Sequence, residues 1–165
     1  MKTLCIISAR GGSKGVPGKN LKILNGLPLI AHAFIKAKNT KNIDHIICST
    51  DSTEIQNIAK EYNIDVPFIR PPELATDTIP LITVTQHAMF EMDKLHKSFE
   101  IIMQFSPTCP FIKVENLEKS VSTCKNDNCD SAVSLQKIEH EHPYRARKVL
   151  DNDFFENFIS NINVE

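Results

Sequence analysis

Short apolar runs alternate with segments of helical periodicity along most of this 165-residue chain. The first run, residues 4–7 (L-C-I-I), is continuously apolar, as is typical of a strand that is buried on both faces of a parallel sheet. Parallel neighbours need a crossover connection, which is usually a helix. We therefore predict an α/β fold, in which a doubly wound, mainly parallel sheet carries helices on both faces and the crossovers are right-handed.

The same patterns give approximate bounds for the individual elements. The predicted helices are residues 28–39, a segment that begins after Ser52, residues 81–95 and residues 114–125. The predicted strands are residues 4–7, 43–48, 66–69, 99–104 and 131–135. Ser52 is placed to cap the second helix. Residues 70–78 begin with an arginine and two prolines, which exclude a regular helix there and predict a shaped loop.

The composition is that of an ordinary globular protein. Hydrophobic residues make up 41% of the chain and charged residues 24%, enough to form a core. The net charge of −1 excludes the general basic surface of nucleic-acid-binding proteins. No stretch approaches the roughly 18 apolar residues of a membrane span, and residues 4–7 are too short for a signal-peptide core. We expect one domain over residues 1–165, in the cytoplasm, with neither nucleic acid nor a membrane as partner.

The segment after the first predicted strand has the composition of an anion-binding loop. Residues 7–20 contain four glycines, the hydroxyl of Ser13 and three cations, Arg10, Lys14 and Lys19. Glycines let backbone N–H groups approach an anion closely, and the cations add donors that suit phosphate oxygens. The alternative is a solvated basic loop, but the position directly after a buried strand argues against it. We predict that the loop binds phosphate, and specifically a triphosphate.

Two common phosphate-binding motifs do not fit this loop. In the P-loop pattern G-x-x-x-x-G-K, the first glycine falls on Ser13, and Asn20 replaces the metal-binding hydroxyl residue. The dinucleotide pattern G-x-G-x-x-G is not matched either. In doubly wound sheets, ligands bind outside the carboxyl ends of the strands. Residues 10–20, 49–52, 70–78 and 106–110 all begin at such ends, so we predict a single site there.

The loop sequence A-R-G-G-S-K-G-V-P-G-K-N at residues 9–20 resembles the signature of the acylneuraminate cytidylyltransferases, the CMP-sugar synthetases for nonulosonic acids. The resemblance extends through S-T-D at 49–51 and R-P-P-E-L-A-T-D at 70–77, and more loosely through P-T-C-P at 107–110 and H-P at 142–143. It covers nearly the whole chain. It implies a Rossmann-like nucleotidyltransferase that transfers CMP from CTP to a nonulosonic (sialic-type) acid and releases pyrophosphate.

The resemblance also implies roles for individual residues. Arg10, Ser13, Lys14 and Lys19 would hold the triphosphate, and Asn20 and Arg70 would bind the cytidine part. Lys19 and Arg145 are the implied catalytic residues, with Arg145 near the acidic sugar after the H-P segment. Taken by itself, Arg145 can equally be a surface arginine. Asp51 and Asp77 are possible metal ligands, but we expect them to support a helix N-terminus and a turn, respectively.

One departure from the family pattern concerns the sugar. Ser106 stands where the family has a sugar-binding glutamine, and Gln104 lies two positions earlier, on the same face of a strand but further from its tip. Gln104 and Ser106 are therefore the sugar-binding candidates. The acidic sugar itself stays open, and a 3-deoxy-manno-octulosonate cytidylyltransferase is an alternative.

A second departure is the end of the chain at Glu165. Family members continue for several dozen residues, which carry a dimerisation segment and paired aspartates that bind a divalent metal. The resemblance thus implies Mg²⁺ as cofactor and a homodimer, while the metal ligands stay unknown. The five cysteines are scattered, and Cys124 and Cys129 lack C-x-x-C spacing, so we expect small core residues instead of a metal site. A truncated, non-catalytic nucleotide-binding fragment is a further alternative.

Overall fold

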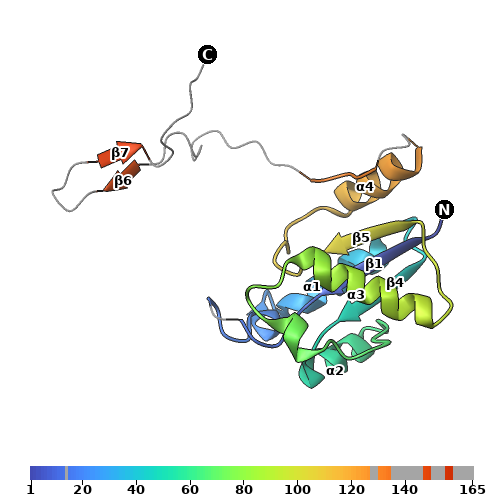
Figure 1. The fold of residues 1–165 in the computed structure, drawn as a ribbon, viewed down its shortest axis with the longest axis horizontal. Coiled ribbons are helices and arrows are strands. Elements are labelled where there is room, and N and C mark those ends of the chain that lie inside the picture. Colours follow the sequence, from blue (N-terminus) through green and yellow to red (C-terminus); the bar gives the residue numbers. More distant parts are fainter. Residues whose placement is uncertain (14, 127–129, 135–146, 150–154, 158–165) are drawn as a thin grey trace, which may run out of the picture. The chain divides into compact units, whose positions relative to one another are not determined.

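The computed structural model describes residues 1–13, 15–126, 130–134, 147–149 and 155–157 (Figure 1). By its internal contacts the chain forms two compact units, Met1–Val133 and Ser134–Glu165. In the second unit, β6 (Arg147–Val149) pairs with β7 (Phe155–Asn157) in an antiparallel hairpin. The single domain expected over residues 1–165 stays a prediction.

The first unit is built on a parallel sheet of order β4-β1-β5, formed by β1 (Thr3–Ser8), β4 (His45–Ser49) and β5 (Ile101–Phe105). The central strand β1 pairs with β4 from Leu4 opposite His45, and with β5 from Thr3 opposite Ile101. The apolar run of β1 is fully buried, as the sequence predicted for a central strand of a parallel sheet.

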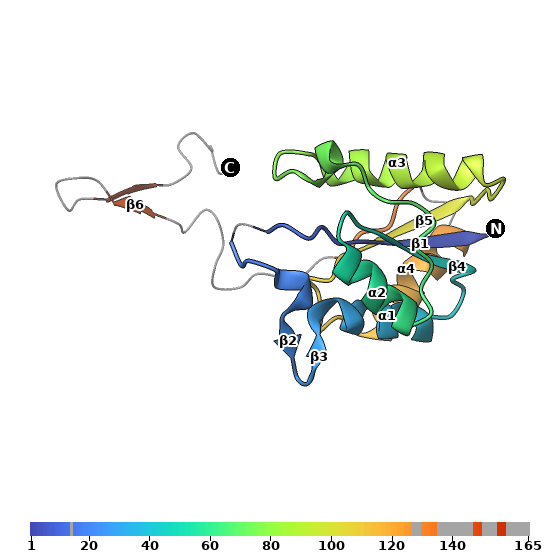
Figure 2. The ribbon, with the colours of Figure 1, turned by 90° about the horizontal axis from the view of Figure 1, so that it is seen from below.

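Helices cover both faces of this sheet (Figure 2). Successive side chains of β1 point to opposite faces, so Leu4 and Ile6 pack against Ala88 and Met92 of α3 (Leu81–Lys94). The other face, which includes Cys5 and Ile7, is covered by three helices: α1 (Leu29–Asn39), α2 (Thr53–Glu61) and α4 (Val114–Asn126). The layers confirm the predicted α/β architecture. Among the described helices, none is long and apolar enough to cross a bilayer.

The helices form where the apolar spacing predicted them. In α1, Ile30, Ala33, Phe34 and Ala37 make the buried stripe. The Ser52 side chain accepts a hydrogen bond from the Ile55 backbone N–H at 3.4 Å and caps α2, as expected.

Two predicted strands are absent from the described residues. Residues 66–69 make no strand, because Pro67 has no N–H to donate to a ladder. Main-chain contacts of this segment with β4 and the residue after it include the bridge between Asp65 and Ile47 and the bond from Arg70 N–H to Thr50 O at 2.9 Å. Residues 131–134 have no strand partner in the described structure, and Val133 is 77% exposed. Leu135 lies outside the described residues.

Four short elements of the first unit were not predicted, namely two 3-10 helices and the two strands of a hairpin. The 3-10 helix η1 (Lys19–Leu21) follows Gly18, which has a φ of 62° and therefore favours glycine. The hairpin of β2 (Ile23–Leu24) and β3 (Leu27–Pro28) turns through an Asn-Gly pair with positive φ at both residues. The 3-10 helix η2 (Pro72–Ala75) forms part of the predicted loop.

His45, the first residue of β4, makes the stability of the fold depend on pH. Its ring stacks on Phe99 with centroids 6.0 Å apart, and its Nε2 lies 3.1 Å from Asp65 Oδ2. Burial, aided by Lys97, lowers the pKa of His45 below its usual value, against the opposing effect of Asp65. The His45 imidazole therefore binds a proton more tightly in the unfolded chain than in the folded protein. Its contribution to the free energy of unfolding is fully present above the unfolded pKa and is lost as the pH falls through the folded pKa.

We expect His45→Gln to reduce this dependence. As the pH is lowered from above the usual histidine pKa of about 6.5 to about 5, the free energy of unfolding should fall more steeply for the natural chain than for His45→Gln. Urea unfolding followed by circular dichroism measures both slopes. His96→Gln, at an exposed histidine, is the control. Equal slopes for the natural chain and His45→Gln would contradict the prediction.

Candidate functional site

A cavity of about 220 Å³ lies beyond the carboxyl ends of β1 and β5. Residues from the loop after β1, from the segment around η2, from the start of α3 and from the loop after β5 line it. These lining residues are Ser8, Arg10, Ser13, Lys19, Asn20, Arg70, Leu74, Thr76, Asp77, Ile79, Leu81, Val84, Ser106, Pro107 and Thr108. The cavity thus lies where a doubly wound sheet is expected to bind its ligand.

Five of the six predicted nucleotide-binding residues line this cavity: Arg10, Ser13, Lys19, Asn20 and Arg70. The sixth, Lys14, lies outside the described residues, as does Arg145. Three of the five are cations that come from two loops far apart in the sequence. The fold therefore brings together the positive charges that the sequence assigned to one ligand.

The start of the loop after β1 is held by contacts that only a glycine allows. The Gly11 N–H donates to Asp51 Oδ1 at 2.8 Å. A Cβ at Gly11 would lie 2.9 Å from the Cβ of Ser52, closer than side chains tolerate. Asp51 thus supports the start of this loop, whereas we expected it to support a helix N-terminus. It does so through the Gly11 amide, a partner that the sequence did not indicate.

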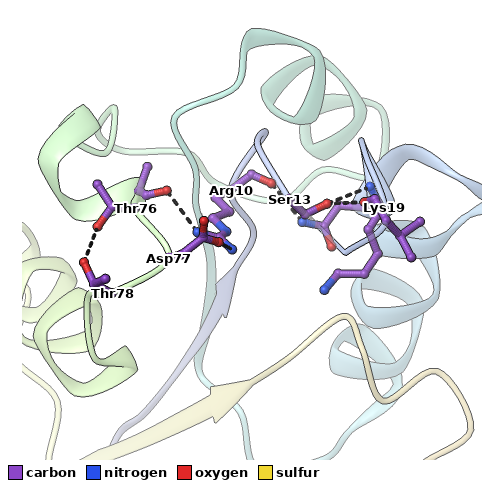
Figure 3. Close-up of polar contacts among 9 residues, drawn as sticks. Arg10, Ser13, Lys19, Thr76, Asp77 and Thr78 are labelled. Carbon is purple, nitrogen blue, oxygen red and sulfur yellow. Dashed lines mark hydrogen bonds and ion pairs between the residues drawn. The ribbon is translucent and has the colours of Figure 1, made fainter.

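The rest of this loop folds onto itself through two polar side chains (Figure 3). Ser13 Oγ donates to Val16 O and accepts from the Lys19 backbone N–H at 3.3 Å. Asn20 is 6% exposed, and its Nδ2 donates to Arg10 O at 3.0 Å. Ser13 and Asn20 therefore shape the loop as well as line the cavity.

Arg10 connects this loop to the segment that contains η2 (Figure 3). Its Nη1 donates to Ala75 O at 3.3 Å, and its Nη2 forms an ion pair with Asp77 Oδ1. Both side chains of the pair are partly exposed, 27% for Arg10 and 34% for Asp77. Asp77 was expected to close a turn, and its contact with Arg10 was not predicted.

Arg70 is a buried cation in the wall of the cavity. The residue is 3% exposed, and its Nε donates to Ser49 Oγ at 3.1 Å while its Nη2 donates to Ser49 O. Burial lowers the pKa of Arg70, partly offset by Asp51 and Cys48, but an arginine side chain stays charged in proteins. Its two bonds to Ser49 fix the guanidinium, which has five N–H donors in total.

The two sugar-binding candidates differ in their position. Ser106 lines the cavity, and its Oγ lies 2.8 Å from Thr108 Oγ1. Gln104 lies behind Ser8, outside the set of lining residues: its Nε2 donates to Ser8 Oγ at 3.5 Å and its Oε1 accepts from Thr85. Of the two candidates, only Ser106 is therefore among the residues that line the cavity.

The described residues contain no group of three or more His, Cys, Asp or Glu side chains that could hold a metal ion. Cys5 and Cys48 are buried, and burial raises the pKa of each thiol to about 12, so they are inert core residues as expected. Cys109 is exposed and Cys124 is half-buried. Cys129 and the H-P segment lie outside the described residues.

Sequence reasoning missed the apolar part of the cavity. Four apolar side chains are among the lining residues: Leu74, Ile79, Leu81 and Val84. A signal was present, because these residues directly follow the two prolines of the shaped loop and begin the next helix. The cavity consequently combines cationic and apolar lining, which suits a ligand with an anionic end and a less polar ring.

A model of the family described as Cytidylyltransferase matches residues 4–156, so the chain belongs to the cytidylyltransferase family. It is 38% identical over 138 residues to the CMP-N,N'-diacetyllegionaminic acid synthase of Legionella pneumophila, covering 84% of this chain and 59% of that protein. It is 32% identical over 153 residues to the pseudaminic acid cytidylyltransferase of Campylobacter jejuni, covering 93% and 65%. The chain therefore spans about 60% of the length of such relatives.

A solved structure supports the fold. The CMP:2-keto-3-deoxy-manno-octonic acid synthetase complexed with CTP superimposes with a TM-score of 0.65 at 20% identity, covering 78% of this chain and 49% of that one. The likeness confirms the predicted Rossmann-like nucleotidyltransferase fold. The family match likewise confirms the resemblance that the loop sequence indicated.

Proposed function

We propose that this chain binds CTP and transfers CMP to a nonulosonic acid, which gives a CMP-sugar and pyrophosphate. The observation that carries this proposal is the cavity itself, whose lining at the carboxyl ends of the strands includes Arg10, Lys19 and Arg70 together with apolar side chains. The names of the relatives support the acceptor class, because they are synthases or cytidylyltransferases for legionaminic and pseudaminic acids.

In the proposed reaction, the anomeric hydroxyl of the sugar attacks the α-phosphorus of CTP. A new P–O bond forms, the bond between the α- and β-phosphates breaks, and the hydroxyl proton is released. Such a step needs positioning and charge neutralisation more than covalent help from the protein. Arg10 and Lys19 would stabilise the charge that develops on the leaving pyrophosphate, with Lys14 as their neighbour in the loop.

The remaining residues would orient the substrates. Arg70, fixed by Ser49, and Asn20 would hold the cytidine part, and Ser106 would contact the sugar at the rim of the cavity. Arg145 would bind the carboxylate of the sugar, since a guanidinium matches that group with two parallel hydrogen bonds. A homodimer in the cytoplasm is proposed on the resemblance alone.

Magnesium is also proposed on the resemblance alone, and the described residues do not fit it. Asp51 accepts from Gly11 and Asp77 is paired with Arg10, so both carboxylates near the cavity are engaged by donors. No step of the proposed reaction is therefore assigned to a metal held by these residues.

Calorimetric titration of the chain with CTP and with ATP, both with Mg²⁺, tests the nucleotide half of the proposal. We expect selective binding of CTP, followed by release of pyrophosphate when legionaminic, pseudaminic, N-acetylneuraminic or 3-deoxy-manno-octulosonic acid is added. Binding of CTP without turnover would instead indicate a non-catalytic nucleotide-binding chain. If neither nucleotide binds, the proposal is wrong.

A further inference from the structure

Asp77 is a carboxylate that lines a cavity otherwise charged for an anion. The same cavity is lined by the cations Arg10, Lys19 and Arg70. A negative charge at this place repels a triphosphate. Its presence therefore opposes the proposed function unless Asp77 makes another contribution to binding.

The contacts of Arg10 show what that contribution is. Its guanidinium is held at two points, by Ala75 O and by Asp77, which lie at the end of η2 and just beyond it (Figure 3). The main chain at Arg10 is fixed too, because its carbonyl oxygen accepts from Asn20. The Arg10 side chain, which lines the cavity from the loop after β1, is thus held in one orientation by contacts within the protein.

We propose that Asp77 is a positioning residue for the triphosphate, which holds the Arg10 guanidinium over the cavity while the other N–H donors of that group bind the ligand. This inference rests on the proposed function. Fixing an arginine before binding removes the entropy cost of ordering its side chain when the ligand binds. The contacts of Arg10 also join the loop after β1 to the segment around η2.

The repulsion between Asp77 and the triphosphate opposes the orienting effect of Asp77 on Arg10. The exposure of the Arg10–Asp77 ion pair indicates which of the two effects is larger. Both side chains are about a third exposed. Water and salt therefore screen the longer-range repulsion, whereas the contact with Arg10 is direct. The orienting effect should dominate, so that removal of the carboxylate charge weakens CTP binding instead of strengthening it.

Asp77→Asn tests this inference, because asparagine keeps the shape of the side chain and one carbonyl oxygen but removes the charge. Glu73→Gln is the matched control, since Glu73 is an exposed acid on η2 and lies outside the set of lining residues. By calorimetry we expect CTP to bind Asp77→Asn about fivefold more weakly than the natural chain. Cytidine binding to Asp77→Asn, and CTP binding to Glu73→Gln, should stay unchanged.

A double-mutant cycle separates positioning from a general structural role. In the Arg10→Ala background, Asp77→Asn should cause no further weakening of CTP binding, because there is no guanidinium to orient. Equal weakening in both backgrounds would overturn the inference, as would CTP binding to Asp77→Asn that is as tight as to Glu73→Gln. Thermal melting of each variant shows that it is folded before titration. Failure of the natural chain to bind CTP would instead overturn the proposed function.

Discussion

Lys19→Ala should weaken the binding of CTP by about 10- to 100-fold and leave the binding of cytidine nearly unchanged. Lys19 lines the cavity at the start of η1, and its backbone N–H is held by Ser13. A hydrogen bond to a charged group contributes about 1.5–3 kcal/mol, which corresponds to that change in affinity. Because cytidine has no phosphate, it lacks the group that Lys19 would contact. Calorimetric titration with both ligands measures the two changes.

The control for this experiment is Lys22→Ala. Lys22 is an exposed cation that caps the end of η1 and does not line the cavity, so its removal changes the net charge by the same amount. CTP should bind Lys22→Ala almost as tightly as the natural chain. If Lys19→Ala weakens the binding of CTP and the binding of cytidine by the same factor, then Lys19 does not bind the triphosphate.

Phe34→Ala should lower the free energy of unfolding by about 3–5 kcal/mol. Phe34 is fully buried in the core between the sheet and the helices α1, α2 and α4, and its ring centroid lies 6.0 Å from that of Tyr62. Removal of the ring loses the free energy gained by burying it away from water. It also leaves a cavity that the surrounding helices fill only in part. Urea unfolding followed by circular dichroism measures the loss.

The same substitution at Phe111 provides the comparison. Phe111 is 84% exposed in the loop after β5, and Phe111→Ala should change the free energy of unfolding by no more than about 0.5 kcal/mol. Similar losses for the two variants would show that Phe34 is not part of a packed core.

The central strand and the helices have strong local patterns and were predicted correctly, whereas a strand at residues 66–69 was predicted and does not form. The continuous apolar run of residues 4–7 and the helical spacing of α1 contain their own structural signal. Residues 66–69 contain Val66, Phe68 and Ile69, which favour a strand, but whether they join one depends on the edge of β4. Local composition does not include that information.

In the candidate site, too, local sequence indicated which residues to expect but not the contacts that they make with distant loops. The loop sequence indicated the ligand class through Arg10, Ser13 and Lys19, whose types match phosphate chemistry. Asn20 and Arg70, which also line the cavity, came from the family resemblance. It did not indicate that Asp51 holds Gly11 or that Asp77 holds Arg10, since these partners lie on different loops of the fold. The hydrogen bonds of Gln104 with Ser8 and Thr85 were also not predicted, because they depend on how β5 packs against its neighbours β1 and α3.

The parallel register of β1 has a consequence for the synthesis of the protein. Thr3 pairs with Ile101, so β1 cannot gain its second neighbour until β5, which follows all of α1, β4, α2 and α3, has been translated. Until then, the apolar edge of β1 is a template for wrong pairing, and closing so long a loop slows folding. Conditions that slow elongation or crowd nascent chains should therefore affect the yield of this protein more than that of one built from local hairpins.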